Sequence, residues 1–372
     1  MKVRSLRTAD EFKRYAGFAQ EVYSQSQYWI PPDQHHLVSL LGGNKEAGPH
    51  WTVQPFWVES RGQILATLTA VVDELYNRHW NERMGHLLFF EALPDSDAAV
   101  AALFEAACEW LRAQGCGAAR LSFLYAWQLP WTIDAYDTVP TLFHTYNPPS
   151  YHCYAKNAGF RTEQGVVQYQ IAFTPELAAR YREMVARVEA AGVRLRSWNL
   201  NRLEEEGLIF ARLVNETFAG HWGSPQFSPA QMQGFAVAFK DVLPPNFLGF
   251  AEVNGEPVGF VFAIPDLNQA LHRLRGKPVE ENMDEFRRAL GQIDHGALLI
   301  IGVKSSQRGR GINLALAARS YLAMIERGYK TGSYTVVLDD NWPSRRTAEK
   351  LGGRVTRNFI IYRKELVQRS VA

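Results

Sequence analysis

Apolar and polar residues follow the same order of elements twice along the chain. Residues 56–73 read as a strand, a two-residue Arg-Gly turn and a second strand, and residues 249–266 repeat this layout around Asn-Gly. Asn-Gly between two alternating runs is typical of a β-hairpin. After each hairpin come an apolar strand, a long amphipathic helix and another strand. The pattern therefore predicts two copies of one α/β unit.

The long helix of each copy carries an apolar stripe at helical spacing, i, i+3, i+4 and i+7. Gly115 and Gly328 follow these helices at matching places, where glycine often ends a helix. The predicted strand, helix and strand are 84–91, 98–114 and 118–125 in the first copy, and 297–303, 312–327 and 333–338 in the second.

Both copies end with an Asn-x-Pro-Ser segment, at 147–150 and 341–344, followed by a final strand. Between the copies, Thr174 and Pro175 are typical of the start of a helix. We therefore expect a first domain at 1–173, a linker helix at 174–191 and a second domain at 192–372. The second copy also has a polar insertion at 265–295, which is either a lid or a surface decoration.

Composition narrows the class of protein. The chain has 372 residues, 47% of them apolar and 21% charged, which is enough to bury the cores of two domains. The net charge of +2 argues against a dedicated nucleic-acid binder. The three cysteines form no metal-ligand pattern, so no metal site is expected. No apolar run approaches the length of a membrane span and no signal segment is visible, so we expect a cytoplasmic protein without a membrane partner.

One segment carries a recognisable chemistry. Residues 297–311, ALLIIGVKSSQRGRG, predict a buried strand, a glycine loop and a helix start. Free N–H groups and the helix dipole favour an anion there. Gly309 and Gly311 permit close backbone approach, while Arg308 and Arg310 add positive charge. The loop matches neither the P-loop nor the dinucleotide fingerprint. On these grounds alone, a diphosphate or polyphosphate site competes with an ordinary strand–helix turn.

The run 303–312, VKSSQRGRGI, resembles motif A of the GNAT acyl-CoA N-acyltransferases, V-x-P-x-x-R-G-x-G-I. Asp340-Asn341 with Ala348–Gly352 resembles the second motif of that family. The two-copy layout, with PDLNQAL at 265–271 and VLDDN at 337–341, is similar to uncharacterised bacterial tandem-GNAT proteins. The resemblance implies an α/β fold of two tandem GNAT-like domains, each a mixed, mostly antiparallel sheet flanked by helices.

The resemblance also implies a cosubstrate, acetyl-CoA or another acyl-CoA. Main-chain groups of Ile301 and Val303 would pair with pantetheine. Asn341 would touch pantetheine or order the end of the neighbouring strand. The pyrophosphate would bind the N–H groups of Arg308, Gly309, Arg310, Gly311, Ile312 and Asn313.

The chain departs from the family pattern in three places. Ser305 replaces a proline, Asn313 replaces a small residue, and Ala348 stands where the family often has the tyrosine that protonates the leaving thiolate. Tyr334 or Tyr362 could supply this proton instead. The first copy has Leu-Pro-Asp-Ser-Asp at 93–97 in place of the glycine loop, and two carboxylates repel a pyrophosphate. We therefore expect CoA to bind only the second copy.

Few residues are candidates for the site that would bind the acceptor amine. Asp339 and Asp340, at the end of a predicted strand, could accept a proton, and so could Glu252, Asp294 or His295. His221 and Trp222 follow the helix predicted at 203–218, where the family has a loop that shapes the acceptor pocket. We expect His221 and Trp222 to contact the acceptor.

The function expected from the sequence is transfer of an acyl group, most simply acetyl, to an amine of a small molecule or peptide. Two alternatives remain open. One is a non-catalytic acyl-CoA-binding or regulatory module, because Ala348 and the undefined base leave catalysis unproved. The other is an aminoacyl-tRNA-dependent transferase with duplicated GNAT-like domains, against which the low net charge and the predicted CoA loop argue.

Overall fold

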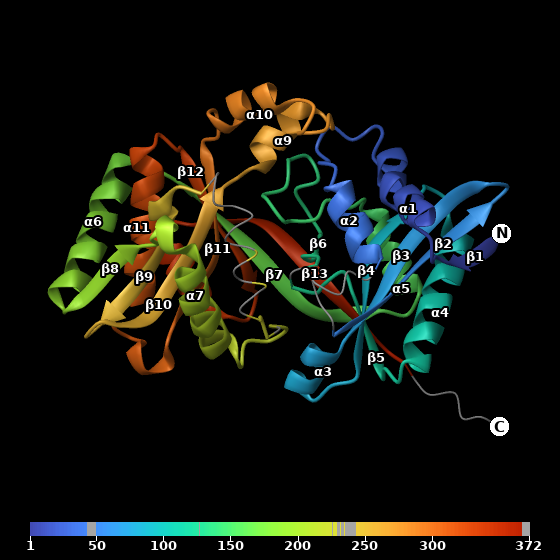
Figure 1. Cartoon of the computed structure of the whole chain (residues 1–372), viewed down its shortest axis with the longest axis horizontal. Helices are drawn as coiled ribbons and strands as arrows, with labels where there is room; N and C mark the ends of the chain where they lie inside the picture. Colours follow the sequence, from blue (N-terminus) through green and yellow to red (C-terminus); the bar gives the residue numbers. More distant parts are fainter. Residues whose placement is uncertain are drawn as a thin grey trace. The chain divides into compact units, whose positions relative to one another are not determined.

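The computed structural model describes residues 1–42, 50–125, 127–224, 226–228, 231, 234 and 243–366. Contacts within the chain divide it into two compact units. The first combines Met1–Gly165 with Phe359–Ala372, and the second is Val166–Asn358. Each unit has mixed, mostly antiparallel strands with helices packed against them (Figure 1). The predicted α/β class with two similar units is thereby confirmed.

In the first unit the strands pair in the order β1-β2-β3-β4-β5, and every pair is antiparallel except β4 with β5. The predicted hairpin is β2 and β3, and the long predicted helix is α4. The elements are β1 (Lys2–Ser5), α1 (Ala9–Val22), α2 (Gln34–Leu41), β2 (Trp51–Ser60), β3 (Gln63–Asp73), α3 (Glu74–Trp80), β4 (Met84–Ala92), α4 (Asp97–Ala113), β5 (Ala118–Leu121), β6 (Trp131–Thr132) and α5 (Ser150–Asn157).

The second unit repeats this order. Its strands pair as β8-β9-β10-β11-β12-β7, and only β11 with β12 is parallel. The elements are β7 (Arg161–Ala172), α6 (Pro175–Ala190), β8 (Val193–Ser197), α7 (Leu203–Phe218), β9 (Leu248–Val253), β10 (Glu256–Pro265), α9 (Asn268–Leu274), α10 (Met283–Leu290), β11 (His295–Val303), α11 (Ile312–Glu326), β12 (Thr331–Leu338), α12 (Trp342–Lys350) and β13 (Arg354–Glu365).

The closing strand of each repeat completes the other unit. Strand β7 follows the first Asn-x-Pro-Ser segment, but its residues from Val166 onward belong to the second unit and pair with β12. Strand β13 follows the second such segment, but from Phe359 onward it belongs to the first unit and pairs with β5 and β6. Helix α6, predicted as a linker, packs on α11 within the second unit.

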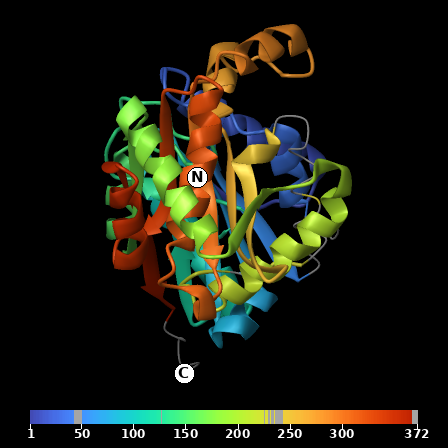
Figure 2. The same ribbon diagram turned by 90° about the vertical axis from the view of Figure 1, so that its left-hand side faces the viewer.

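Helices α11 and α7 cover opposite faces of the second unit's strands, as Figure 2 shows for α6 and α11 on one side and α7 on the other. Two glycines of β11 lie where these helices pack on the strand. A Cβ added at Gly296 would lie 2.5 Å from the sulfur of Met324 on α11, and one at Gly302 would lie 2.7 Å from the hydroxyl of Thr217 on α7. Both glycines are therefore required for close helix packing.

Helix α2 contains His35 and His36, and Asp33 caps this helix by accepting a hydrogen bond from the His36 N–H.

Candidate functional site

Among the described residues, the main chain of β11 has no partner strand on one side over its second half. Strands β11 and β12 pair from His295 with Thr331 to Leu298 with Tyr334, and then diverge. Beyond this point β11 continues to pair with β10, and the Lys304 N–H donates to the Val258 carbonyl at 2.8 Å. Alternation along an antiparallel ladder then turns the N–H and C=O groups of Ile301 and Val303 away from β10, toward the diverging side.

The loop after β11 is shaped by its two glycines. Gly309 has φ +81° and Gly311 has φ +77°, so both lie in the left-handed region that favours glycine. No atom lies within 4 Å of a Cβ built at Gly309. Gly311 is the N-cap of α11 and offers no side-chain acceptor. Among the described residues no side chain caps the first N–H groups of α11, so these groups are available to a ligand.

The basic residues of the loop lie at the surface. Arg308 and Arg310 are both exposed. Arg310 donates to the Gln307 side chain and to the Ala191 carbonyl at the end of α6. Lys304 pairs with Glu216 of α7 at 3.1 Å. The loop thus carries two exposed guanidinium groups beside the start of a helix, an arrangement that suits an anion.

Polar side chains gather where α11 begins beside α12. The Tyr334 hydroxyl lies 3.1 Å from the Ser344 hydroxyl, and burial raises the pKa of Tyr334. The Asn313 amide donates to the Thr347 hydroxyl at 3.4 Å. Asn341 caps α12 by accepting from the Ser344 N–H. Asn341 therefore orders the start of α12, and Tyr334 is a core residue with its hydroxyl turned toward α12.

Position 348 has no room for an added ring. Ala348 is fully buried in the core of the second unit. Its carbonyl accepts from the Gly353 N–H at 2.9 Å. The family's tyrosine position is therefore occupied by core packing in this chain.

The acidic candidates have different surroundings. Asp339 and Asp340 are exposed at the end of β12, and the Asp339 carbonyl accepts from Arg345. Asp294 pairs with Lys330 at 3.0 Å, and the hydrogen bond from Gln269, together with this pair, lowers the pKa of Asp294. Burial lowers the pKa of His295 to about 4.

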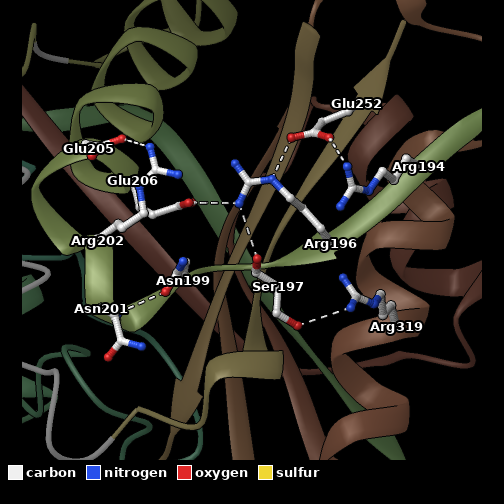
Figure 3. A network of polar contacts seen from close by, with 10 residues as sticks. All are labelled: Arg194, Arg196, Ser197, Asn199, Asn201, Arg202, Glu205, Glu206, Glu252 and Arg319. Carbon is white, nitrogen blue, oxygen red and sulfur yellow. Dashed lines mark hydrogen bonds and ion pairs between the residues drawn. The ribbon is translucent and has the colours of Figure 1, made fainter. Parts of the chain in front are cut away.

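Glu252 belongs to an ion-pair network that anchors α7 (Figure 3). Arg196 on β8 binds Glu252 on β9 and also Glu206 on α7, the latter at 2.9 Å. Arg194 adds a second, longer contact to Glu252 at 3.6 Å. Glu206 and Glu252 are both buried, and burial costs each carboxylate its hydration. The positive charge of the guanidinium that they share offsets this cost. Glu252 therefore holds α7 against the edge strands.

His221 and Trp222 lie in the loop after α7 and are half-buried. The His221 ring packs on Phe218 with centroids 5.1 Å apart. Burial lowers the pKa of His221, while the main chain of Trp222 and the Asp340 carboxylate oppose this effect. The structure thus brings His221 near Asp340. Pro225 of the same loop lies outside the described residues.

The corresponding region of the first unit is filled by side chains. Strands β4 and β5 pair from Met84 with Ala118 to Leu87 with Leu121 and then diverge, as β11 and β12 do. Here the Tyr151 hydroxyl accepts from the Ala92 N–H at 2.8 Å, and the Gln128 side chain accepts from the Phe89 N–H at 2.7 Å. Side chains therefore already bind the N–H groups of Phe89 and Ala92.

The residues that fill this region were not predicted from the sequence. Trp131 is 1% exposed and packs on Phe90 and Tyr151 with ring centroids 5.8 and 5.5 Å away. Asn147 holds Trp131 in place by binding the N–H and carbonyl of Thr132. The many aromatic residues between 127 and 151 were the available signal in the sequence. Their role depends on their packing partners, which only the structure shows.

Solved structures of the same architecture exist. A tandem GNAT protein from the clavulanic acid biosynthesis pathway superposes over 99% of both chains with a TM-score of 0.59 at 13% identity. A GCN5-related N-acetyltransferase from Sphaerobacter thermophilus matches over 98% of this chain and 95% of its own, with a TM-score of 0.54 and 13% identity. The chain has the tandem GNAT fold, which confirms the resemblance seen in its motifs.

Two curated proteins are similar in sequence over nearly the whole chain, although no protein-family model matches it. The bacterial ceramide synthase of Caulobacter vibrioides is 24% identical over 377 residues, 98% of each chain. Protein YghO of Escherichia coli strain K12 is 23% identical over 379 residues, 98% of this chain and 95% of YghO.

Two further observations concern the described part of the chain. No helix there is both long and apolar enough to cross a membrane. No group of three or more His, Cys, Asp or Glu side chains there is arranged to hold a metal ion.

Proposed function

We propose that the chain is an acyl-CoA-dependent N-acyltransferase with a single acyl-CoA site in the second unit. The observation that carries this proposal is the open main chain of Ile301 and Val303 leading directly into the Gly309–Gly311 loop. A pantetheine arm carries amides that can pair with an open strand edge, and its diphosphate suits the N–H groups at the start of a helix.

The proposed contacts follow the order of the ligand. Ile301 and Val303 bind the pantetheine amides through their main chains. Arg308 and Arg310 are exposed, and their guanidinium groups bind phosphate from the loop. The N–H groups from Gly309 to Asn313 bind the diphosphate, and Asn341 keeps α12 in register beside the pantetheine path.

The proton donors and acceptors are proposed from their surroundings. Tyr334 remains the proposed donor to the leaving thiolate, because burial keeps its phenol protonated and its hydroxyl faces α12. Asp339 and Asp340 remain the proposed acidic groups near the amine, being exposed at the end of β12.

For the acceptor, we propose a long-chain amino alcohol. The support is the similarity to the relative named as a ceramide synthase over 98% of both chains. A ceramide is the amide of a long-chain amino alcohol and a fatty acid, so the same relative favours a fatty acyl-CoA donor. The family resemblance alone favours acetyl-CoA, and the two donors must be compared directly.

The test is thiol release with pairs of donors and acceptors. Acetyl-CoA and palmitoyl-CoA are each combined with sphinganine, glucosamine and a lysine peptide, and free CoA thiol and amide product are measured. Amine-dependent thiol release from any pair supports the enzyme, and fastest release with palmitoyl-CoA and sphinganine supports the proposed substrates. Tight CoA binding without release would instead favour a binding module.

A further inference from the structure

The end of helix α7 lies directly over the open half of β11. Gly302 leaves no space for a side chain, since an added Cβ would meet the Thr217 hydroxyl at 2.7 Å and the Phe260 ring at 2.8 Å. Glu216 of α7 also pairs with Lys304, the first residue after β11, at 3.1 Å. The ion pairs of Arg196 with Glu206 and Glu252 fix the other half of α7 on β8 and β9. The loop that begins at Ala219 therefore starts beside the end of β11, where Gly302 and Lys304 contact α7.

His221 is the ionisable side chain that this loop brings to the site. Its Nδ1 atom is buried and has no hydrogen-bond partner among the described residues. The imidazole packs against Phe218, whose ring in turn lies 6.3 Å from that of Phe260 on β10. The charged group that acts on it is Asp340, from the end of β12 on the diverging side of the strands. His221 therefore lies between α7 and the end of β12.

Resting on the proposed function, we propose that His221 is the general base that accepts the proton of the acceptor amine, and that Asp340 is a positioning residue that stabilises the imidazolium. The amine nitrogen forms a bond to the thioester carbonyl carbon, and the C–S bond breaks with its electron pair leaving on sulfur. The N–H proton passes to the imidazole of His221, Tyr334 protonates the thiolate, and the imidazolium then gives up its proton to restore Tyr334. The products are an amide, the free thiol of CoA and neutral His221.

Other basic groups are less suited to this role. Strand β11 carries no carboxylate along its open half, His295–Val303 being HGALLIIGV. Glu252 binds two arginines, and Asp294 binds Lys330. Burial lowers the pKa of His221, so the imidazole is neutral at pH 7 and able to accept a proton.

The experiment compares wild type with His221→Ala, Asp340→Asn and, as a matched control, His35→Ala, which removes an exposed imidazole from the first unit. Each is assayed with the fastest donor and acceptor pair of the wild type, over pH 5 to 9. CoA binding is measured by calorimetry and folding by thermal unfolding. We expect His221→Ala to lower kcat by about 10²–10⁴-fold, with little change in CoA affinity.

Two readouts separate a base from a structural residue. Added imidazole should restore part of the activity of His221→Ala and leave His35→Ala unchanged. The acidic limb of kcat/KM should disappear in His221→Ala and move to lower pH in Asp340→Asn, because removing the carboxylate lowers the pKa of the imidazole further. Glu216 and Lys304, the other charged pair beside the loop, remain in every variant.

A folded, CoA-binding His221→Ala that keeps the wild-type rate and the acidic limb overturns this role for His221 and leaves the acyltransferase standing. Wild-type protein that binds CoA but releases no thiol with any amine overturns the proposed function, and the role of His221 with it.

Discussion

The two units differ most at the place where their parallel strands diverge. Strands β4 and β11 both span nine residues, and each leaves its parallel partner after the fourth residue. In the first unit the ring of Tyr151 and the indole of Trp131 are buried against Phe90, which is itself 2% exposed. In the second unit the matching residue, Ile301, is half-exposed. One strand framework thus supports a filled site and an open one.

The main chain shows the same contrast. The N–H groups of Leu93 and Lys304 each donate to the neighbouring hairpin strand, so Ala92 and Val303 face the diverging side in the same way. The Tyr151 hydroxyl binds the Ala92 N–H. Val303 leads instead into a loop with two left-handed glycines. Tyr151 from α5, Trp131 from β6 and Gln128 thus occupy in the first unit the region that lacks such side chains in the described part of the second.

The largest effect is expected on removing the filling side chain. Trp131→Ala should lower the free energy of unfolding by about 3–5 kcal/mol, because it leaves a cavity in the core of the first unit. Denaturant unfolding measures the loss. CoA binding should keep its stoichiometry, since the first unit has aspartates instead of the glycine loop. A second CoA site in this variant would show that the aromatic filling alone prevents binding.

Gly311→Glu should weaken CoA binding by about 100-fold or more, equivalent to about 2.7 kcal/mol. The change places a carboxylate at the diphosphate position and forces a side chain into φ +77°. Calorimetry measures the affinity, and circular dichroism checks the fold. The matched control is Ala98→Glu, in the exposed first turn of α4, which should bind CoA as wild type does. Unchanged affinity in a folded Gly311→Glu protein would rule out the loop as the diphosphate site.

Ala348→Tyr tests whether the second unit keeps the family's space for a proton donor. Because Ala348 is fully buried, the added ring should cost about 1–3 kcal/mol of stability and give no gain in kcat. Thermal unfolding and acyl-transfer rates must be measured on the same preparation. A stable variant with faster thiol release would show that the position does open toward the sulfur.

The smallest effect is a pH dependence confined to the first unit. Glu91 occupies the place of Gly302, and its carboxylate accepts from the Tyr151 hydroxyl at 2.8 Å. Burial raises the pKa of Glu91 to about 8. Between pH 4.5 and about 8 the unfolded chain loses a proton that the folded chain keeps, so stability falls as pH rises.

Glu91→Gln should remove this part of the pH dependence, so its stability relative to wild type should rise from pH 5 to pH 8. Denaturant unfolding at both pH values provides the measurement. Parallel changes in the two proteins would mean that Glu91 is ionised throughout. CoA binding should be the same in both, because the group lies in the filled unit.

Local sequence signals predicted most elements, because hairpins, glycine stops and apolar stripes depend on neighbouring residues. Helix α7 has the predicted bounds, Leu203–Phe218, and the start of α11 at Ile312 is also as predicted. The exchange of β7 and β13 between units was not predictable, since both strands have the same apolar pattern and only pairing partners distinguish them.

The same division between local signals and distant contacts applies to the candidate site. The left-handed conformation of Gly309 and Gly311 follows from the residue type, while the anion site at this loop stays a prediction. The burial of Ala348, the packing of Thr217 on Gly302 and the approach of His221 to Asp340 depend on contacts between residues far apart in the chain. Sequence spacing carries no information on such contacts until the elements are placed.

We propose that only the second of the two similar units binds CoA. Calorimetric titration of the intact chain with CoA is the decisive measurement, with the same titration on Gly311→Glu as the reference for the second unit. We expect one site per chain, and an affinity lowered by about 100-fold or more in Gly311→Glu. Two equivalent sites per chain, or one site of unchanged affinity in a folded Gly311→Glu protein, would contradict it.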